Sequence, residues 1–166
     1  PSLRRSVVGE EPGEAMHHSG GALSESRYIY GRLIEPAFEN LPAGPAFLSL
    51  GLGLGYNEAL IAERAVLCDQ HTWRCVSYEA DPVLRESFLG YLRGELASGE
   101  VFDTYDSIFR GLREPELVRE ELLQAFREGR WILEGPLLAD SRPPFQIQAY
   151  LWDAFSRKTS LDLWNE

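Results

Sequence analysis

The stretch Phe47-Leu-Ser-Leu-Gly-Leu-Gly-Leu-Gly-Tyr-Asn57 decides the fold of this chain. Its apolar start is typical of a buried strand, and glycines then occupy every second position, at Gly51, Gly53 and Gly55. A helix-forming segment follows directly, at residues 57–68. The pattern therefore predicts a strand, a tight glycine turn and a helix, with backbone N–H groups and the positive helix end at the carboxyl edge of the strand.

The spacing of the glycines separates this turn from the dinucleotide-binding fingerprint. That fingerprint has its third glycine three positions after the second. Here the third glycine comes after two positions, and Tyr56 fills the dinucleotide slot. The G-x-G-x-G spacing resembles instead that of S-adenosylmethionine (SAM) methyltransferases. Plain strand-to-helix connections also carry such turns, so the function depends on what accompanies the turn.

The composition indicates one globular domain over residues 1–166. With 166 residues, 44% of them hydrophobic, the chain can bury a core. We expect an irregular arm at residues 1–23, a helical segment at 24–41 and a ligand-binding core at 46–166.

The net charge of −10 argues against simple electrostatic binding of nucleic acid, which needs Lys and Arg side chains against phosphates. Lys158 is the only lysine among sixteen basic residues, so any phosphate contact would depend on arginine. No apolar run is long enough to span a membrane. Cys68 and Cys75 lack metal-ligand spacing, and we expect them to be buried thiols in a cytoplasmic protein without a metal.

Hydrophobic periodicity predicts helices that alternate with strands. A helix at 24–41 contains Pro36, which should kink or divide it. Strand, helix and strand over residues 47–79 make a right-handed parallel βαβ unit. We therefore expect an α/β, Rossmann-like fold with a mostly parallel sheet and helices on both faces. The remaining elements are helices at 82–98, 105–112 and 115–128 and strands at 131–138 and 145–152.

Three carboxylates are predicted to follow strands: Glu79, Asp140 and Asp153. Ligands of open parallel sheets bind beyond the carboxyl ends of the strands. Glu79 comes about twenty residues after the glycine turn, where an acid accepts hydrogen bonds from ribose hydroxyls. Asp140 is placed to accept from an adenine amino group, and Asp153 to project into the cleft beside the turn. Each acid alone fits a solvated loop, whereas the combination predicts a nucleoside-type pocket.

Several short motifs occur in an order that resembles one enzyme family. They are residues 13–26, which end in His18-Ser-Gly-Gly-Ala-Leu-Ser-Glu-Ser26, residues 49–57, Tyr78-Glu-Ala-Asp-Pro82, Trp152-Asp-Ala-Phe-Ser156 and Leu163-Trp164. Together they resemble the methyltransferase domain of the tRNA 5-methylaminomethyl-2-thiouridine biosynthesis enzymes, in its stand-alone form. The resemblance covers nearly the whole chain, and Asp153-Ala-Phe-Ser156 with Leu163-Trp164 is its most specific part.

The resemblance implies a SAM-dependent N-methyltransferase with tRNA as its partner, acting on the aminomethyl group of a modified wobble uridine. Asp153 would be the catalytic residue, facing the methyl group and the acceptor amine, and a carboxylate there can accept the amine's proton. Phe155 and Ser156 would lie on the substrate side. The implied SAM-binding residues are Gly51, Gly53, Gly55 and Asn57 at the methionine end, Glu79 at the ribose, Asp140 at the adenine, and Glu25 closing the site.

Departures from the family pattern keep other functions open. Ser49 stands where these enzymes usually carry an acid, residues 157–160 lack the usual prolines, and three more strands are expected after Asp153. The bare strand edge would need a cover, such as a missing segment or a second copy of the chain. The alternatives are a SAM-dependent methyltransferase of a small molecule, which the acidic charge fits more easily, and a degenerate domain that serves as a partner module.

Overall fold

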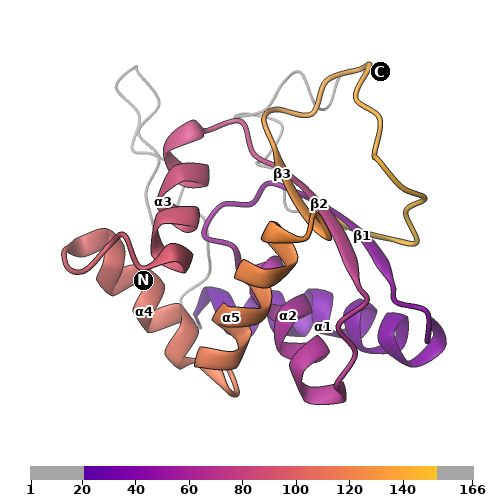
Figure 1. Cartoon of the computed structure of the whole chain (residues 1–166), viewed down its shortest axis with the longest axis horizontal. Helices are drawn as coiled ribbons and strands as arrows, with labels where there is room; N and C mark the ends of the chain where they lie inside the picture. The colour runs from indigo at the N-terminus through magenta and orange to yellow at the C-terminus, as the bar shows by residue number, and fades with distance from the viewer. Residues whose placement is uncertain (1–20, 153–166) are drawn as a thin grey trace.

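The computed structural model describes residues 21–152, which form an α/β arrangement of five helices and a four-stranded sheet (Figure 1). The strands are β1 (Ala46–Leu50), β2 (Arg74–Tyr78), β3 (Trp131–Glu134) and β4 (Ala149–Trp152). The helices are α1 (Ala22–Asn40), α2 (Tyr56–Cys68), α3 (Pro82–Arg93), α4 (Glu100–Arg110) and α5 (Pro115–Arg127).

The strand order β3-β2-β1-β4 confirms the predicted parallel sheet. Leu50 of β1 lies opposite Tyr78 of β2 on one side and opposite Trp152 of β4 on the other, and every pairing is parallel. The chain moves outward from β1 through β2 to β3, and then returns to place β4 on the other side of β1. Ligands of open α/β sheets bind where the order reverses, which here is beyond the carboxyl ends of β1 and β4. The glycine turn leaves β1 at this place.

The helices of the described chain pack against one face of the sheet (Figure 1). Side chains of alternate strand residues, such as Phe47, Cys75 and Trp131, point to this face and join the buried residues of all five helices in one core. Each large apolar side chain buried there contributes about 1.5–3 kcal/mol relative to exposure, so this layer holds most of the hydrophobic stabilisation. α2 lies between α1 and α5 and touches both.

The second face is covered by the connection between β3 and β4, where helices on both faces were expected. Its buried side chains, Leu48, Leu50, Val76 and Tyr78, pack against a neighbour in β3 and three apolar residues of the connection, Ile132, Leu137, Phe145 and Ile147. Within residues 21–152 no helix contributes to this cluster. The expectation of two helical faces is therefore wrong for the described chain, because the connection carries Pro136, Pro143 and Pro144 and cannot form a helix.

Both strands that border this connection are shorter than predicted. β3 ends at Glu134 rather than near Leu138, and β4 begins at Ala149 rather than at Phe145. The apolar residues beyond these ends suggested longer strands, but they fold back onto the sheet face instead of pairing along its edge. The apolar pattern therefore predicted the burial of these residues correctly, but their pairing with a neighbouring strand was predicted wrongly.

Some helices begin or end at other residues than the periodicity predicted. α3 ends at Arg93 because Gly94 adopts φ +75°, the left-handed conformation that closes a helix. α4 begins at Glu100, five residues before the predicted Tyr105. α1 runs past Pro36 without a division; Pro36 is exposed, so the carbonyl that loses its helical partner can bond to water.

Candidate functional site

The glycine turn between β1 and α2 depends on three left-handed glycines. Gly51, Gly53 and Gly55 have φ values of +81°, +53° and +73°, which residues with a Cβ adopt at a cost. The Gly51 N–H donates to the Tyr78 carbonyl at 2.9 Å, so the turn is tied to the end of β2. α2 begins at Tyr56 with no side-chain cap. The predicted order of strand, turn and helix is therefore confirmed.

Gly55 is also required by packing. A Cβ built on this residue would lie 2.4 Å from Cζ of Phe88, which belongs to α3. No real Cβ comes that close to a ring, so the third glycine makes room for a side chain of the protein itself. This matches the general role of the third glycine in such turns, which is close packing rather than ligand approach.

Glu79, the acid at the end of β2, is bonded to the glycine turn, and its predicted contact with a ribose remains a prediction. The residue is only 4% exposed. Its Oε2 accepts the Gly53 N–H at 3.0 Å, and its Oε1 accepts the Asp81 N–H at 2.9 Å. Each carboxylate oxygen has a second lone pair, so a ligand hydroxyl can still donate to it. The structure thus holds a buried carboxylate against the turn at the switch point.

Among the buried polar atoms that have no hydrogen-bond partner within residues 21–152 are Ser49 Oγ on β1, Asn57 Oδ1 on α2 and the Tyr105 hydroxyl on α4. Ser49 belongs to β1 and Asn57 to the first turn of α2, so they flank the glycine turn. Buried polar atoms normally have partners, and each exception needs an explanation, such as a ligand. Asn57 is therefore well placed to accept a donor from a bound molecule.

Tyr105 is a candidate that the sequence did not single out. The Phe88 ring that abuts Gly55 also contacts the Tyr105 ring, with centroids 5.5 Å apart. Burial, followed by the negative charge of Glu79 and the neighbouring Tyr56, raises the pKa of Tyr105, so its hydroxyl stays protonated and can donate. Burial likewise raises the pKa of Tyr56 to about 12. In sequence, Tyr105 is one member of an apolar helical stripe, which is the ordinary pattern of a core residue.

Asp140 was predicted to stand at the end of a strand, and this prediction is wrong. β3 ends at Glu134, and Asp140 lies in an exposed turn six residues further along. The acid at the carboxyl end of β3 is Glu134, whose carbonyl accepts the Glu79 N–H at 3.2 Å. A role for Asp140 at an adenine remains a prediction, and the structure does not bring it to the glycine turn.

α1 carries Glu25 in its first turn and contacts the end of β4. Glu25 lies half-buried in the first turn of α1. One turn later, the Tyr30 hydroxyl donates to the Trp152 carbonyl at 2.6 Å. Trp152 is the last described residue of β4 and precedes Asp153. The predicted catalytic residue Asp153 and the substrate-side Phe155 and Ser156 lie outside the described residues.

The cysteines follow the expectation only in part. Cys75 is buried, and burial followed by the charge of Glu58 raises the pKa of its thiol well above the ordinary value. Cys68 is exposed, because the last residue of α2 faces solvent. Between residues 21 and 152 no three His, Cys, Asp or Glu side chains are grouped to hold a metal ion. In the same part of the chain, no helix is long and apolar enough to cross a membrane.

The fold and the site together define a class: an α/β protein whose glycine turn and buried acid meet at the switch point of a parallel sheet. Comparisons with protein-family models, with curated proteins and with solved structures find no match to this chain. A more specific assignment therefore depends on the site together with the sequence resemblance described above.

Proposed function

We propose that this chain is a SAM-dependent N-methyltransferase that acts on the aminomethyl group of a modified wobble uridine in tRNA. One observation carries the proposal: the buried Glu79 carboxylate is bonded to Gly53 of the glycine turn, at the point where the strand order reverses. This is the arrangement in which a nucleoside can donate its ribose hydroxyls to the acid while its other end lies along the turn. The choice of SAM and of tRNA comes from the sequence resemblance.

The described residues are suited to SAM. Glu79 can accept the two ribose hydroxyls on its remaining lone pairs. The unpartnered Asn57 Oδ1 can accept from the ammonium group at the methionine end, and the protonated Tyr105 hydroxyl can donate to a ligand oxygen or nitrogen. When bound, SAM would supply an activated methyl group on a sulfonium. The buried surroundings of these groups would keep water away from it.

The chain's own residues would prepare the acceptor. An alkyl amine is mostly protonated at neutral pH, so it must lose a proton before its nitrogen can attack. Asp153 follows Trp152, whose carbonyl is held by Tyr30, and its carboxylate would orient the amine and accept that proton. In-line positioning of the amine would provide the larger part of the rate enhancement.

A second function is favoured by the net charge of −10. A small-molecule acceptor would use the same SAM site and would need no basic surface for phosphates. The two functions differ in their dependence on salt: tRNA binding should weaken steeply as the salt concentration rises, whereas a neutral small acceptor should be indifferent.

Calorimetric titration of SAM into the chain tests the cofactor site. We expect Glu79→Gln to weaken SAM binding about tenfold or more, because hydrogen bonds to a charged group contribute about 1.5–3 kcal/mol. Glu134→Gln is the matched control, since it removes an exposed carboxylate at the end of the adjacent strand. Equal SAM affinity in the Glu79 variant and the wild type would refute the cofactor assignment. Methyl transfer from labelled SAM to tRNA that lacks the final methyl group then tests the acceptor.

A further inference from the structure

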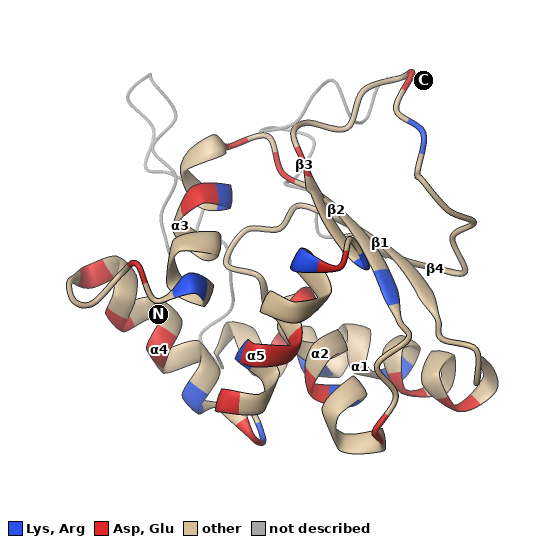
Figure 2. Cartoon of the chain, viewed as in Figure 1, with Lys and Arg blue, Asp and Glu red and all other residues tan. Residues whose placement is uncertain are grey.

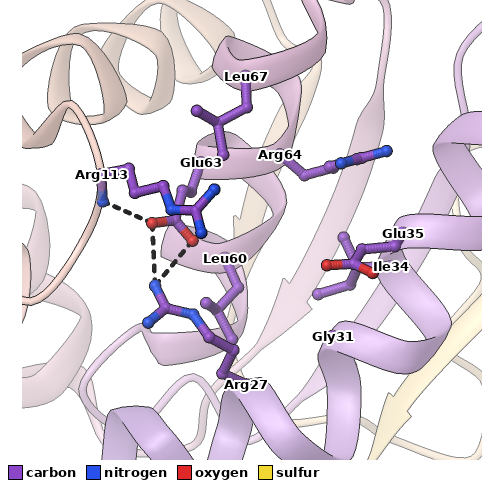
Figure 3. A pocket seen from close by; sticks show the side chains of 9 residues that line it. All are labelled: Arg27, Gly31, Ile34, Glu35, Leu60, Glu63, Arg64, Leu67 and Arg113. Carbon is purple, nitrogen blue, oxygen red and sulfur yellow. Dashed lines mark hydrogen bonds and ion pairs between the residues drawn. The ribbon is translucent and has the colours of Figure 1, made fainter.

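A pocket of about 140 Å³ lies between α1 and α2, away from the glycine turn (Figure 3). α1 contributes Arg27 and Glu35, α2 contributes Glu63 and Arg64, and Arg113 from the loop between α4 and α5 closes one end. The volume is several times the share of one water molecule in the liquid, about 30 Å³, so it can hold a small polyatomic group.

Glu63 organises one side of the pocket and is fully bonded. Arg27 Nη2 donates to both of its carboxylate oxygens at 2.9 Å, and the Arg113 backbone N–H donates to Oε1 at 2.6 Å. The Glu63 side chain is 8% exposed and its charge is balanced by Arg27. The Arg27–Glu63 ion pair therefore lines this side of the pocket with a net charge close to zero.

Two further arginines keep donors that nothing in the described chain accepts. The guanidinium of Arg113 forms no hydrogen bond or ion pair within residues 21–152, and in Figure 3 this side chain reaches over the Glu63–Arg27 pair. Arg64 bonds the exposed Glu39 through Nη2 at 3.1 Å, while its Nε is buried without a partner. A buried donor without an acceptor marks a place where one is missing.

The lining of the pocket is less acidic than the chain as a whole. Three guanidinium groups and two carboxylates line it, and Glu39 outside the lining pairs with one of the three, Arg64, whereas the chain has 26 acidic and 16 basic residues. Figure 2 shows acidic residues along α4 and α5. Glu35 is the one lining carboxylate without a bonded partner in the described chain, and it opposes an anion there.

We propose that this pocket binds a phosphate group. Arg64 belongs to α2 and Arg113 to the loop between α4 and α5, so a ligand that bonded both would need acceptor oxygens in more than one plane. A tetrahedral phosphate offers them, whereas a carboxylate presents two oxygens in a single plane.

Helix α1 connects the pocket with the end of β4. Gly31, which lines the pocket, follows directly after Tyr30, whose hydroxyl donates to the Trp152 carbonyl. An RNA whose modified base reached that end would pass along α1, so one of its phosphodiesters would be able to enter the pocket. We assign the bound phosphate to the backbone of the acceptor RNA, and this source rests on the proposed function.

The test compares two ligands, inorganic phosphate by calorimetry and a labelled tRNA anticodon stem-loop by fluorescence anisotropy over a series of salt concentrations. Arg113→Gln should weaken RNA binding about tenfold and lower the salt-dependence slope by about 1, because one phosphate contact is lost. Glu35→Gln should strengthen binding of both ligands, because it removes a repulsive charge. Arg127→Gln, at the exposed end of α5, removes the same charge elsewhere and should leave both affinities unchanged.

The outcomes separate the pocket from the proposed function. RNA binding that responds to Arg113→Gln and Glu35→Gln in opposite directions supports the pocket, even if no methyl transfer to RNA is found. Variants that bind RNA and phosphate as the wild type does, with unchanged circular dichroism, overturn the pocket. Phosphate binding that the variants alter, without any effect on RNA, overturns the RNA source and leaves a site for free phosphate.

Discussion

The substitution Gly55→Ala tests how the glycine turn is held in place. Alanine must adopt φ +73° there, which costs about 1–2 kcal/mol in the left-handed region. Its Cβ would also lie 2.4 Å from Phe88 Cζ, and forcing extra volume into a packed core costs about 1–3 kcal/mol. The two effects add to about 2–5 kcal/mol, a large part of the 5–15 kcal/mol by which a domain is typically stable.

Gly129→Ala is the matched control for this substitution. Gly129 has nearly the same dihedral angle, φ +71°, but nothing lies within 4 Å of a Cβ built on it. It should therefore show the backbone cost alone, about 1–2 kcal/mol. Urea unfolding followed by the fluorescence of the buried Trp73 and Trp131 measures both variants.

The comparison has one refuting result. If Gly55→Ala destabilises the chain no more than Gly129→Ala does, Phe88 does not fill the space next to Gly55. If the reasoning holds, combining Gly55→Ala with Phe88→Leu should cost less than the sum of the two single changes, because the smaller side chain relieves the overlap.

Three further predictions concern other buried groups. Tyr105→Phe should leave the free energy of unfolding unchanged or raise it, because the lost hydroxyl has no partner within residues 21–152, while SAM binding measured by calorimetry weakens; a loss of more than 1 kcal/mol in urea unfolding would contradict this. Glu121→Ala should cost about 1–3 kcal/mol in the same assay, since it leaves the buried Trp73 indole N–H without the acceptor that it bonds at 2.7 Å, while Arg130 keeps its bond to Glu128; an unchanged free energy of unfolding would contradict this. The raised pKa of Tyr56 means that between pH 10 and about 12 the folded state keeps a proton that the unfolded state loses, so the free energy of unfolding should fall as the pH rises through this range. In Tyr56→Phe this fall should be smaller, whereas the pH dependence of stability below pH 9 should match that of the wild type.

The sequence predicted the parts of the fold that local patterns determine. The alternation of apolar strands with amphipathic helices gave the parallel β1-α2-β2 unit, and three alternating glycines gave the turn. The place of Glu79 beside that turn follows from its position at the end of the second strand, whereas its role at a ribose remains a prediction. These features depend on residues that are close together in the sequence, so local patterns were enough to predict them.

The parts that were wrong depend on distant contacts. Leu137, Phe145 and Ile147 pack on the second sheet face, and periodicity alone could not distinguish such packing from strand pairing. Asp140 was predicted at a strand end only because the predicted strand, 131–138, extends four residues beyond the end of β3 at Glu134. Tyr105 and the pocket of Arg64 and Arg113 arise where α4 and its following loop meet the first half of the chain, and no local motif marks such a meeting.

The position of β4 has a consequence for the order in which this protein folds. The backbone of β4 pairs only with β1 among the described strands, and the Gln148 side chain that accepts the Ala46 N–H comes from 102 residues away. Contacts of such long sequence separation form late, since closing a long loop must precede them. The β1-α2-β2 unit, with its glycine turn and Glu79, can assemble from local contacts beforehand. We therefore expect amide hydrogens of β4 to gain protection from exchange last during refolding, and the proposed SAM site to be completed only at that step.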